Sequence, residues 1–195
     1  MMVSVATTPN ARRASILESA TAVFLRYGFR KASMDDLARA AGLSRQGLYL
    51  HFATKDALFR DVVLHLLATM RDQTVAALTR SSPDTEARLL GAFEAMHRHG
   101  IGLRDAEHLS ELLVESERLV GSAVADLERE LTDAIALLLQ DSGIAKQWTS
   151  VGISAHSLAE QLYLTSLGLK HRAASELGFK EGMRIAIRII AQSAT

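Results

Sequence analysis

An all-α fold is predicted by three features of the sequence. Only two prolines, Pro9 and Pro83, interrupt the 195 residues, and helix-forming residue types dominate elsewhere. Apolar residues recur three and four positions apart almost throughout, whereas the alternation typical of a half-buried strand is never sustained. Hydrophobic residues make up 48% of the chain, enough for a buried core. We therefore expect about nine helices, arranged as a small N-terminal head and a larger helical body.

The N-terminal segment predicts a basic amphipathic helix followed by a short one. Residues 10–27 carry apolar side chains on one face, and Gly28 is expected to end this helix in a left-handed conformation. Ser33 and Asp36 form an approximate capping box, which predicts a second helix that ends at Ala41.

A third short helix completes a helix-turn-helix pattern. Gly42 supplies the turn, and Ser44 caps a helix that reaches about His51. In this motif the second of two short helices protrudes and can enter the major groove of DNA. The two helices are expected to share a small core formed by Leu37, Ala38, Ala41, Leu43, Leu48 and Phe52.

The rest of the chain predicts longer helices. Thr54 caps a fourth helix with an extended apolar stripe up to Met70, and Ser81-Ser82-Pro83-Asp84 marks a break and a new start, with Pro83 suited to a first turn. We assign residues 10–55 to the head and 56–195 to the body. The further helices are expected over residues 84–99, 105–116, 119–140, 152–174 and 179–192.

The charge distribution favours a polyanionic partner for the head. Lys and Arg balance Asp and Glu overall, but residues 1–55 carry a net charge of +5 and residues 56–195 a net charge of −5. A basic head on an acidic body attracts a polyanion to one part of the molecule. Chance fluctuation of a few charges is the alternative explanation.

The exposed face of the third helix carries the candidate base-reading residues. Arg45 can pair bidentately with guanine, Gln46 with adenine, and Leu50 with a thymine methyl group. Gly47 costs about 1 kcal/mol of helix stability relative to alanine, and its missing side chain would allow a closer approach to the duplex. The residues expected to contact phosphates, which hold the register without reading sequence, are Ser33, Ser44, Tyr49, His51 and Lys55.

Purely structural explanations stand beside these assignments. Tyr49 is also consistent with packing on the first helix, and His51 with a hydrogen bond inside the head. Arg45 and Gln46 are also consistent with ordinary solvated positions. Lys55 at a helix start is unfavourable for the helix dipole, which favours an external anion as its partner.

Residues 12–67 resemble the DNA-binding head of the tetracycline-repressor family. After the basic helix, the shared pattern is Gly28-Phe29, Ser33, Leu37-Ala38, Ala41-Gly42-Leu43-Ser44, Leu48-Tyr49-x-His51-Phe52, Lys55 and Leu58. Ser33 stands where the family often has threonine, and Gly47 where alanine or threonine is common. The resemblance implies a double-stranded DNA partner, a homodimer and a small-molecule effector. Two heads on a two-fold axis would read a palindromic operator with half-sites about 34–36 Å apart.

The resemblance also implies that the last two long helices form the dimer interface. The final helix has apolar residues on more than one face and must therefore be buried on more than one side. An ordinary core within one chain explains the same pattern. The expected interface residues are Leu158, Leu162, Thr165, Ser166, Leu169, Met183, Ile187 and Ile190.

A ligand pocket is implied between the fourth helix and the helices after Pro83. Its candidate wall residues, each also consistent with plain core packing, are His65, Met70, Met96, His97, Leu113 and Trp148. His97-x-His99 has the composition of a metal pair, but residues two apart on a helix point to different faces. We therefore expect neither a metal nor a cofactor.

Other functional classes are disfavoured. The sequence has no cysteine, no Gly-rich phosphate loop, no H-E-x-x-H and no G-x-S-x-G, so we expect no enzyme. It has no signal-peptide pattern and no membrane-spanning apolar run, which predicts a cytoplasmic protein without a membrane partner.

We expect a transcriptional repressor that leaves its operator when an effector bound in the body shifts the fourth helix. One alternative is a DNA-binding protein of the same type that is controlled by a protein partner. A helical adaptor without a DNA role is a second alternative, but it leaves the basic head unexplained.

Overall fold

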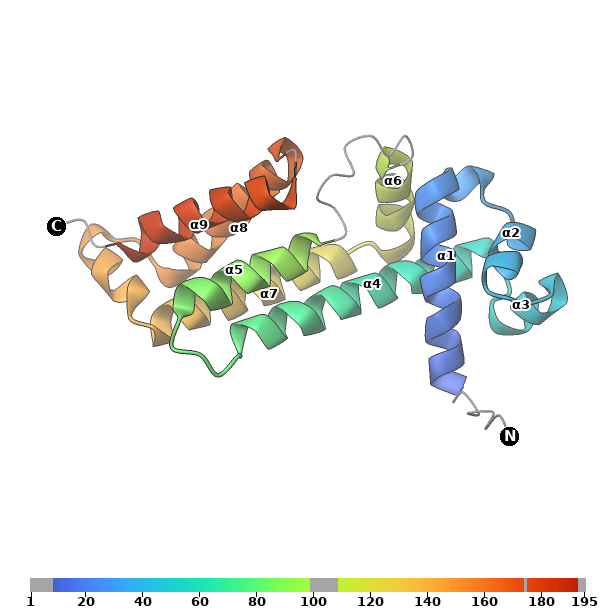
Figure 1. The fold of residues 1–195 in the computed structure, drawn as a ribbon, viewed down its shortest axis with the longest axis horizontal. Coiled ribbons are helices and arrows are strands. Elements are labelled where there is room, and N and C mark those ends of the chain that lie inside the picture. Colours follow the sequence, from blue (N-terminus) through green and yellow to red (C-terminus); the bar gives the residue numbers. More distant parts are fainter. Residues whose placement is uncertain (1–8, 99–108, 174, 193–195) are drawn as a thin grey trace. The chain divides into compact units, whose positions relative to one another are not determined.

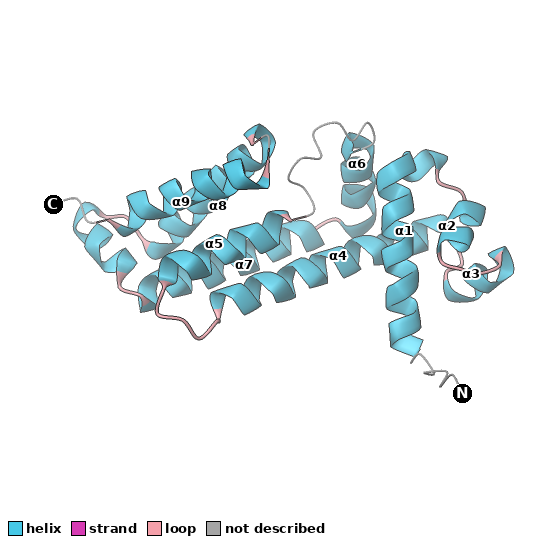
Figure 2. Ribbon diagram, viewed as in Figure 1, coloured by secondary structure: helices cyan, strands magenta, loops and turns pink. Residues whose placement is uncertain are grey.

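The computed structural model describes residues 9–98, 109–173 and 175–192, and every regular element within them is a helix (Figures 1 and 2). The all-α prediction is confirmed. The elements are α1 (Pro9–Lys31), α2 (Met34–Ala40), α3 (Arg45–His51), α4 (Lys55–Leu78), α5 (Thr85–His97), α6 (Leu109–Val120), α7 (Ala123–Asp141), the 3-10 helix η2 (Ile144–Val151), α8 (Ala155–Arg172) and α9 (Glu176–Ala191).

The helices form two compact units. The head unit comprises residues 1–67 and 106–124, and thus α1, α2, α3, the start of α4, and α6. The body unit comprises residues 68–105 and 125–195, and thus the rest of α4, α5, most of α7, η2, α8 and α9. The head unit therefore includes one helix, α6, that lies far from α1–α3 in the sequence.

Three phenylalanines form the centre of the head unit. The ring of Phe59 in α4 lies edge-on to Phe24 and Phe29 of α1, with centroid distances of 4.9 and 5.0 Å. Phe24 and Phe29 stack at 6.1 Å. Such pairs add about 0.5–1.5 kcal/mol each beyond the free energy of burying their area. The cluster joins both ends of the chain segment that contains α2 and α3.

Several predicted helix boundaries were wrong; α8 begins three residues later and α9 three residues earlier than expected. Gly28 breaks the helical geometry with φ 75°, but another helical turn follows and α1 ends at Lys31. The break expected near residues 117–118 falls instead at Gly121, whose φ of 46° separates α6 from α7. Pro83 precedes the cap of α5 rather than occupying its first turn, because the Asp84 carboxylate accepts the hydrogen bond from the Ala87 amide.

In the body unit, α5, α8 and α9 pack around a closed apolar core. Phe93, Leu162 and Phe179 are at most 1% exposed. Helices α8 and α9 approach closely, since a Cβ atom on Gly182 would lie 2.6 Å from Cδ2 of Leu169. This contact identifies the side of α9 that faces α8.

The short helix η2 is anchored to the end of α9. The indole nitrogen of Trp148 and the side-chain amide of Gln147 each donate a hydrogen bond of 2.9 Å to the carbonyl oxygen of Ile190. None of the helices in the described ranges has the length and apolar content needed to cross a membrane.

Candidate DNA-binding site

Local capping interactions position α2 and α3. The Ser33 hydroxyl accepts a hydrogen bond from the Asp36 amide at 3.2 Å, and the Asp36 carboxylate accepts one from the Ser33 amide at 3.3 Å, which confirms the predicted capping box. The Ser33 hydroxyl also donates to the Asp36 carboxylate, and this hydrogen bond, together with that from the Ser33 amide, lowers the pKa of Asp36 below its ordinary value. The Ser44 hydroxyl accepts from the Gly47 amide at 3.0 Å. Both serines are thus engaged within the head.

The turn between α2 and α3 depends on Gly42. Its φ of 65° lies in the left-handed region, which residues with side chains adopt only at a cost. The next amide, of Leu43, donates to the carbonyl of Ala38 at 2.9 Å and closes the turn. Leu48 and Phe52 are buried at 0% and 3% exposure, so α3 is held by one side only.

The opposite side of α3 is exposed. Arg45, Gln46 and His51 are accessible, Tyr49 is 40% exposed, and Leu50 is 83% exposed, more than any other large apolar residue described as exposed. Gly47 is half-buried, and a Cβ atom there would lie 3.2 Å from the Ser44 hydroxyl oxygen. A small residue at position 47 therefore accommodates the cap of its own helix.

Arg45 contacts two side chains of the head. A nitrogen of its guanidinium lies 3.1 Å from a carboxylate oxygen of Asp35 in α2, and its central carbon lies 5.7 Å from the centre of the Tyr49 ring. Tyr49 and Asp35 both raise the pKa of Arg45, with the Tyr49 side chain contributing most. The guanidinium is therefore cationic and oriented although it is solvent-exposed.

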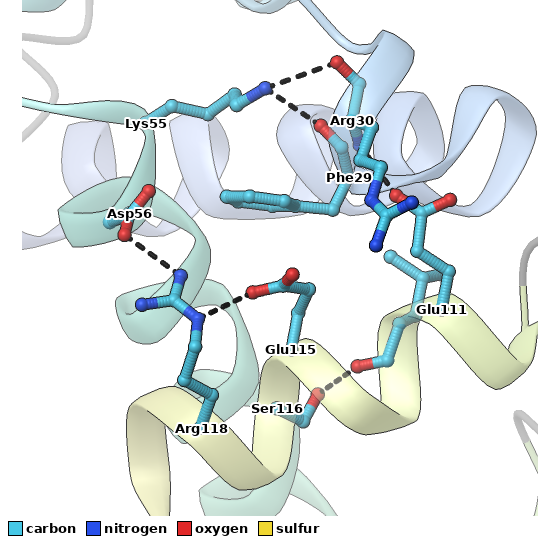
Figure 3. Close-up of polar contacts among 9 residues, drawn as sticks. Phe29, Arg30, Lys55, Asp56, Glu111, Glu115, Ser116 and Arg118 are labelled. Carbon is cyan, nitrogen blue, oxygen red and sulfur yellow. Dashed lines mark hydrogen bonds and ion pairs between the residues drawn. The ribbon is translucent and has the colours of Figure 1, made fainter.

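The Lys55 ammonium is directed into the head (Figure 3). It donates to the carbonyl oxygens of Phe29 at 2.8 Å, Ala32 at 3.1 Å and Arg30 at 3.3 Å, and it lies 4.5 Å from the centre of the Phe29 ring. These carbonyls belong to the last turn of α1 and the residue that follows it, where a cation interacts favourably with the helix dipole. All three N–H donors of the ammonium thus have acceptors within the head.

Arg13 is a structural residue that sequence reasoning missed. Its guanidinium lies 4.5 Å above the Phe52 ring, in the cation–π range, and forms an ion pair with Asp61 of α4. It thereby links α1, the end of α3 and α4. The partners lie 39 and 48 residues away in the sequence, so local spacing contains no signal for them.

Within the head unit, helix α6 contacts α1 and α4 through polar groups (Figure 3). The Arg118 guanidinium lies 2.8 Å from Asp56 in α4 and 2.7 Å from Glu115. The Glu111 carboxylate accepts a hydrogen bond of 2.6 Å from the Arg30 amide at the end of α1. The same end of α1 that Lys55 binds is therefore also held by α6.

The residues expected at the dimer interface lie mostly inside the body unit. Thr165 is exposed, and Leu169 and Ile190 are half-buried. The other five side chains lie in the core of this chain, where a second copy has no access to them. They are Leu158, Leu162, Ser166, Met183 and Ile187, all at most 4% exposed.

The six residues expected to line a ligand pocket are divided between the two units. His65 and Leu113 belong to the head unit, whereas Met70, Met96, His97 and Trp148 belong to the body unit. Leu113 is 62% exposed, and Met96 is buried. His65 and Met70 are half-buried, and Trp148 forms the hydrogen bond to α9 described above.

His97 is a buried polar residue in the body unit. Its Nε2 atom lies 2.8 Å from the Ser166 hydroxyl oxygen, which in turn donates to the Tyr163 carbonyl at 2.6 Å. Burial, together with the nearby charges of Lys170 and His171, lowers the pKa of His97 to about 4. The imidazole is therefore neutral at pH 7 and donates its Nε2 proton to Ser166. His99 of the His97-x-His99 segment lies outside the described residues.

Comparison with known proteins identifies the helix-turn-helix segment. Residues 16–62 match the family described as bacterial regulatory proteins, tetR family. The transcriptional activator FasR of Mycolicibacterium smegmatis is 29% identical over 163 residues, which cover 78% of this chain and 71% of FasR. The transcriptional repressor KstR2 of Mycobacterium tuberculosis is 34% identical over 94 residues, 46% of each chain. These relatives are transcriptional regulators and not enzymes.

Solved structures show the same fold along nearly the whole chain. A TetR-family transcriptional regulator from Agrobacterium tumefaciens superposes with a TM-score of 0.65 and 20% identity, covering 93% of this chain and 98% of that one. The predicted resemblance is confirmed: residues 16–62 match the DNA-binding segment of the TetR family, and the chain has the fold of TetR-family transcriptional regulators.

Proposed function

We propose that the protein is a homodimeric repressor that reads a palindromic operator through α3 and is released by a small molecule. The exposed face of α3 carries the proposal. A leucine that is 83% exposed lies beside accessible Arg45 and Gln46 on a helix whose other side is buried. A side-chain set that offers a guanidinium, an amide and an apolar group matches the chemistry of base edges in the major groove.

A binding titration against DNA upstream of the protein's own gene tests the operator claim. Fluorescence anisotropy at several salt concentrations, with random duplex as competitor, separates specific from electrostatic binding. We expect binding that survives competitor and weakens steeply with salt. The proposal would be contradicted if the protein preferred no DNA sequence, even after selection from a random DNA pool.

Substitution of Arg45 by alanine should reduce discrimination between operator and random duplex roughly fivefold to 150-fold. The reason is that a bidentate arginine–guanine pair contributes about 1–3 kcal/mol against a wrong base. Affinities of both duplexes are measured by competition. Arg60→Ala removes the same charge from an exposed position on α4 and is the control. Equal loss of discrimination in the two variants would remove Arg45 from the base-reading set.

Lys55 is proposed to support DNA binding through the shape of the head. Lys55→Met keeps the apolar stem over Phe29 but leaves three carbonyls without their cation, so we expect a stability loss of about 1–3 kcal/mol. Operator affinity should fall while the slope of log affinity against log salt stays unchanged. A direct phosphate contact would instead flatten this slope by about one unit.

Lys31→Met is the control for Lys55→Met. Lys31 is an exposed lysine at the end of α1, so its replacement removes the same charge from the head. Its thermal unfolding should match that of the wild type. A flattened salt slope in Lys55→Met would restore the phosphate role that the sequence predicts.

The homodimer is proposed to form through the exposed apolar residues of α8 and α9. Leu164, Ile185 and Ile189 are 50%, 61% and 65% exposed, although each lies beside residues of the closed core. Ile185 and Ile189 are four residues apart and so share one side of α9. Large exposed apolar side chains gathered on neighbouring helices are typical of interaction sites. Thr165 lies exposed on α8 and would belong to the same surface.

The effector is proposed to bind among buried polar groups of the body unit. His97 and Ser166 form a hydrogen bond in an apolar core, and the buried Thr74 hydroxyl has no partner in the part of the chain that the structure describes. Few polar groups in an apolar setting are typical of small-molecule sites. A compound screen for loss of operator binding tests this part. Failure of every compound would favour control by a protein partner and leave operator binding intact.

Whether the protein represses or activates transcription needs a separate test, because one of the two relatives named above is an activator and the other a repressor. Repression is proposed on the model of KstR2. In vitro transcription from the operator-bearing promoter should fall as protein is added. A rise would assign this chain the activator's role. We also propose a cytoplasmic location, as the site of DNA and polymerase.

A further inference from the structure

Asp35 is an acidic residue within the proposed DNA-reading surface. It is the second residue of α2, its side chain is 52% exposed, and its carboxylate lies 3.1 Å from the Arg45 guanidinium on α3. A negative charge beside a base-reading arginine is repelled by the phosphates of an approaching duplex. The repulsion by its charge therefore reduces affinity for every DNA sequence.

The contacts of Asp35 indicate a benefit that offsets this loss of DNA affinity. The Asp36 carboxylate, and not that of Asp35, completes the capping box of α2, and Arg39 pairs with Asp36 at 3.5 Å. The Asp35 carboxylate instead reaches across the turn to another helix. Because the guanidinium contacts both the Asp35 carboxylate and the Tyr49 ring, its direction is defined before DNA arrives.

We propose that Asp35 is a specificity-determining residue that orients Arg45 toward one base and so improves discrimination while it weakens binding overall. This inference rests on the proposed base-reading role of Arg45. Asp35 acts through Arg45 and is therefore a positioning residue. Without the carboxylate, the long and flexible arginine can reach neighbouring bases or phosphates, and its preference for one base declines.

The test compares Asp35→Asn with a charge-matched control. The operator is first selected from a random pool with the wild-type protein, and affinities are then measured for it and for each single-base variant. Glu18→Gln removes one exposed acid from α1, away from Arg45 in the chain, and is the control. Both variants should bind random duplex more tightly. Only Asp35→Asn should lose discrimination, by about two- to fivefold, at the base pair that Arg45→Ala identifies.

Two further variants separate positioning from general damage to the head. In an Arg45→Ala background, Asp35→Asn should leave base preference unchanged, because the residue through which it acts is gone. Asp35→Glu keeps the charge and should retain most of the discrimination.

An unchanged base preference in Asp35→Asn, with operator and random duplex bound more tightly by the same factor, would overturn the inference while leaving the proposed function intact. A wild-type protein that selects no sequence would overturn both.

Discussion

Replacing Phe24 by alanine should lower the free energy of unfolding of the head unit by about 3–5 kcal/mol. Phe24 is 1% exposed and lies at the centre of the aromatic cluster, 4.9 Å from the Phe59 ring and 6.1 Å from the Phe29 ring. Its removal leaves a cavity and ends both ring contacts. Because domains are stable by only about 5–15 kcal/mol, a substantial part of that stability would be lost.

Hydrogen exchange of peptides from α2 and α3, followed through a denaturant series, measures this effect locally. Leu25→Ala is the matched control, since the neighbouring Leu25 is 38% exposed and should change stability by less than about 1 kcal/mol. Peptides from α8 and α9 should keep their protection in both variants if the two units unfold separately. Equal loss of protection in the two variants would mean that the aromatic cluster does not hold the head together.

The helix-turn-helix could be predicted because its determinants are local. The capping box links Ser33 to Asp36, three residues away, and Thr54 accepts from the Ala57 amide at 3.0 Å as the cap of α4. Glycine is needed at position 42 because the φ of 65° there lies in the left-handed region. Interactions between residues three or four positions apart can be recognised in a single sequence. Helix α3 accordingly begins and ends within a residue of the predicted bounds.

The polar contacts around the head could not be predicted, because their partners are distant in the sequence. The Lys55 ammonium binds carbonyls 23–26 residues earlier, Arg118 pairs with Asp56 62 residues away, and the Glu111–Arg30 hydrogen bond spans 81 residues. A lysine at a helix start is equally compatible with a phosphate and with a carbonyl cluster. Only the packing of α1 against α4 distinguishes the two.

The proposed dimer surface could not be predicted from the sequence for a different reason. Sequence periodicity identifies which helical positions are apolar, but a face that packs inside the chain and a face that packs on a second copy have the same composition. On α9, Met183 and Ile187 are buried in the chain's own core, whereas Ile185 and Ile189 are exposed. All four are apolar and lie within seven residues. Only the burial of each side chain separates the intrachain positions from those free to meet a partner.

Charging the exposed face of α9 should therefore convert the proposed dimer into a monomer. In the double variant Ile185→Glu and Ile189→Glu, association would bury two carboxylates without partners, which costs several kcal/mol in an apolar interface. Sedimentation should give the mass of one chain, and affinity for the full palindrome should fall roughly 100-fold or more, because the second head no longer binds as part of the same particle.

Binding to a duplex with only one half-site distinguishes loss of the dimer from damage to the head. The double variant should bind it as the wild-type head does, since both substitutions lie in the body unit. Leu137→Glu on α7 is the control, because Leu137 is 58% exposed but lies outside the proposed α8–α9 surface. A double variant that stays dimeric, or a Leu137→Glu variant that dissociates, would move the interface away from Ile185 and Ile189. Full-palindrome affinity and mass should therefore change together in the double variant and remain unchanged in the control.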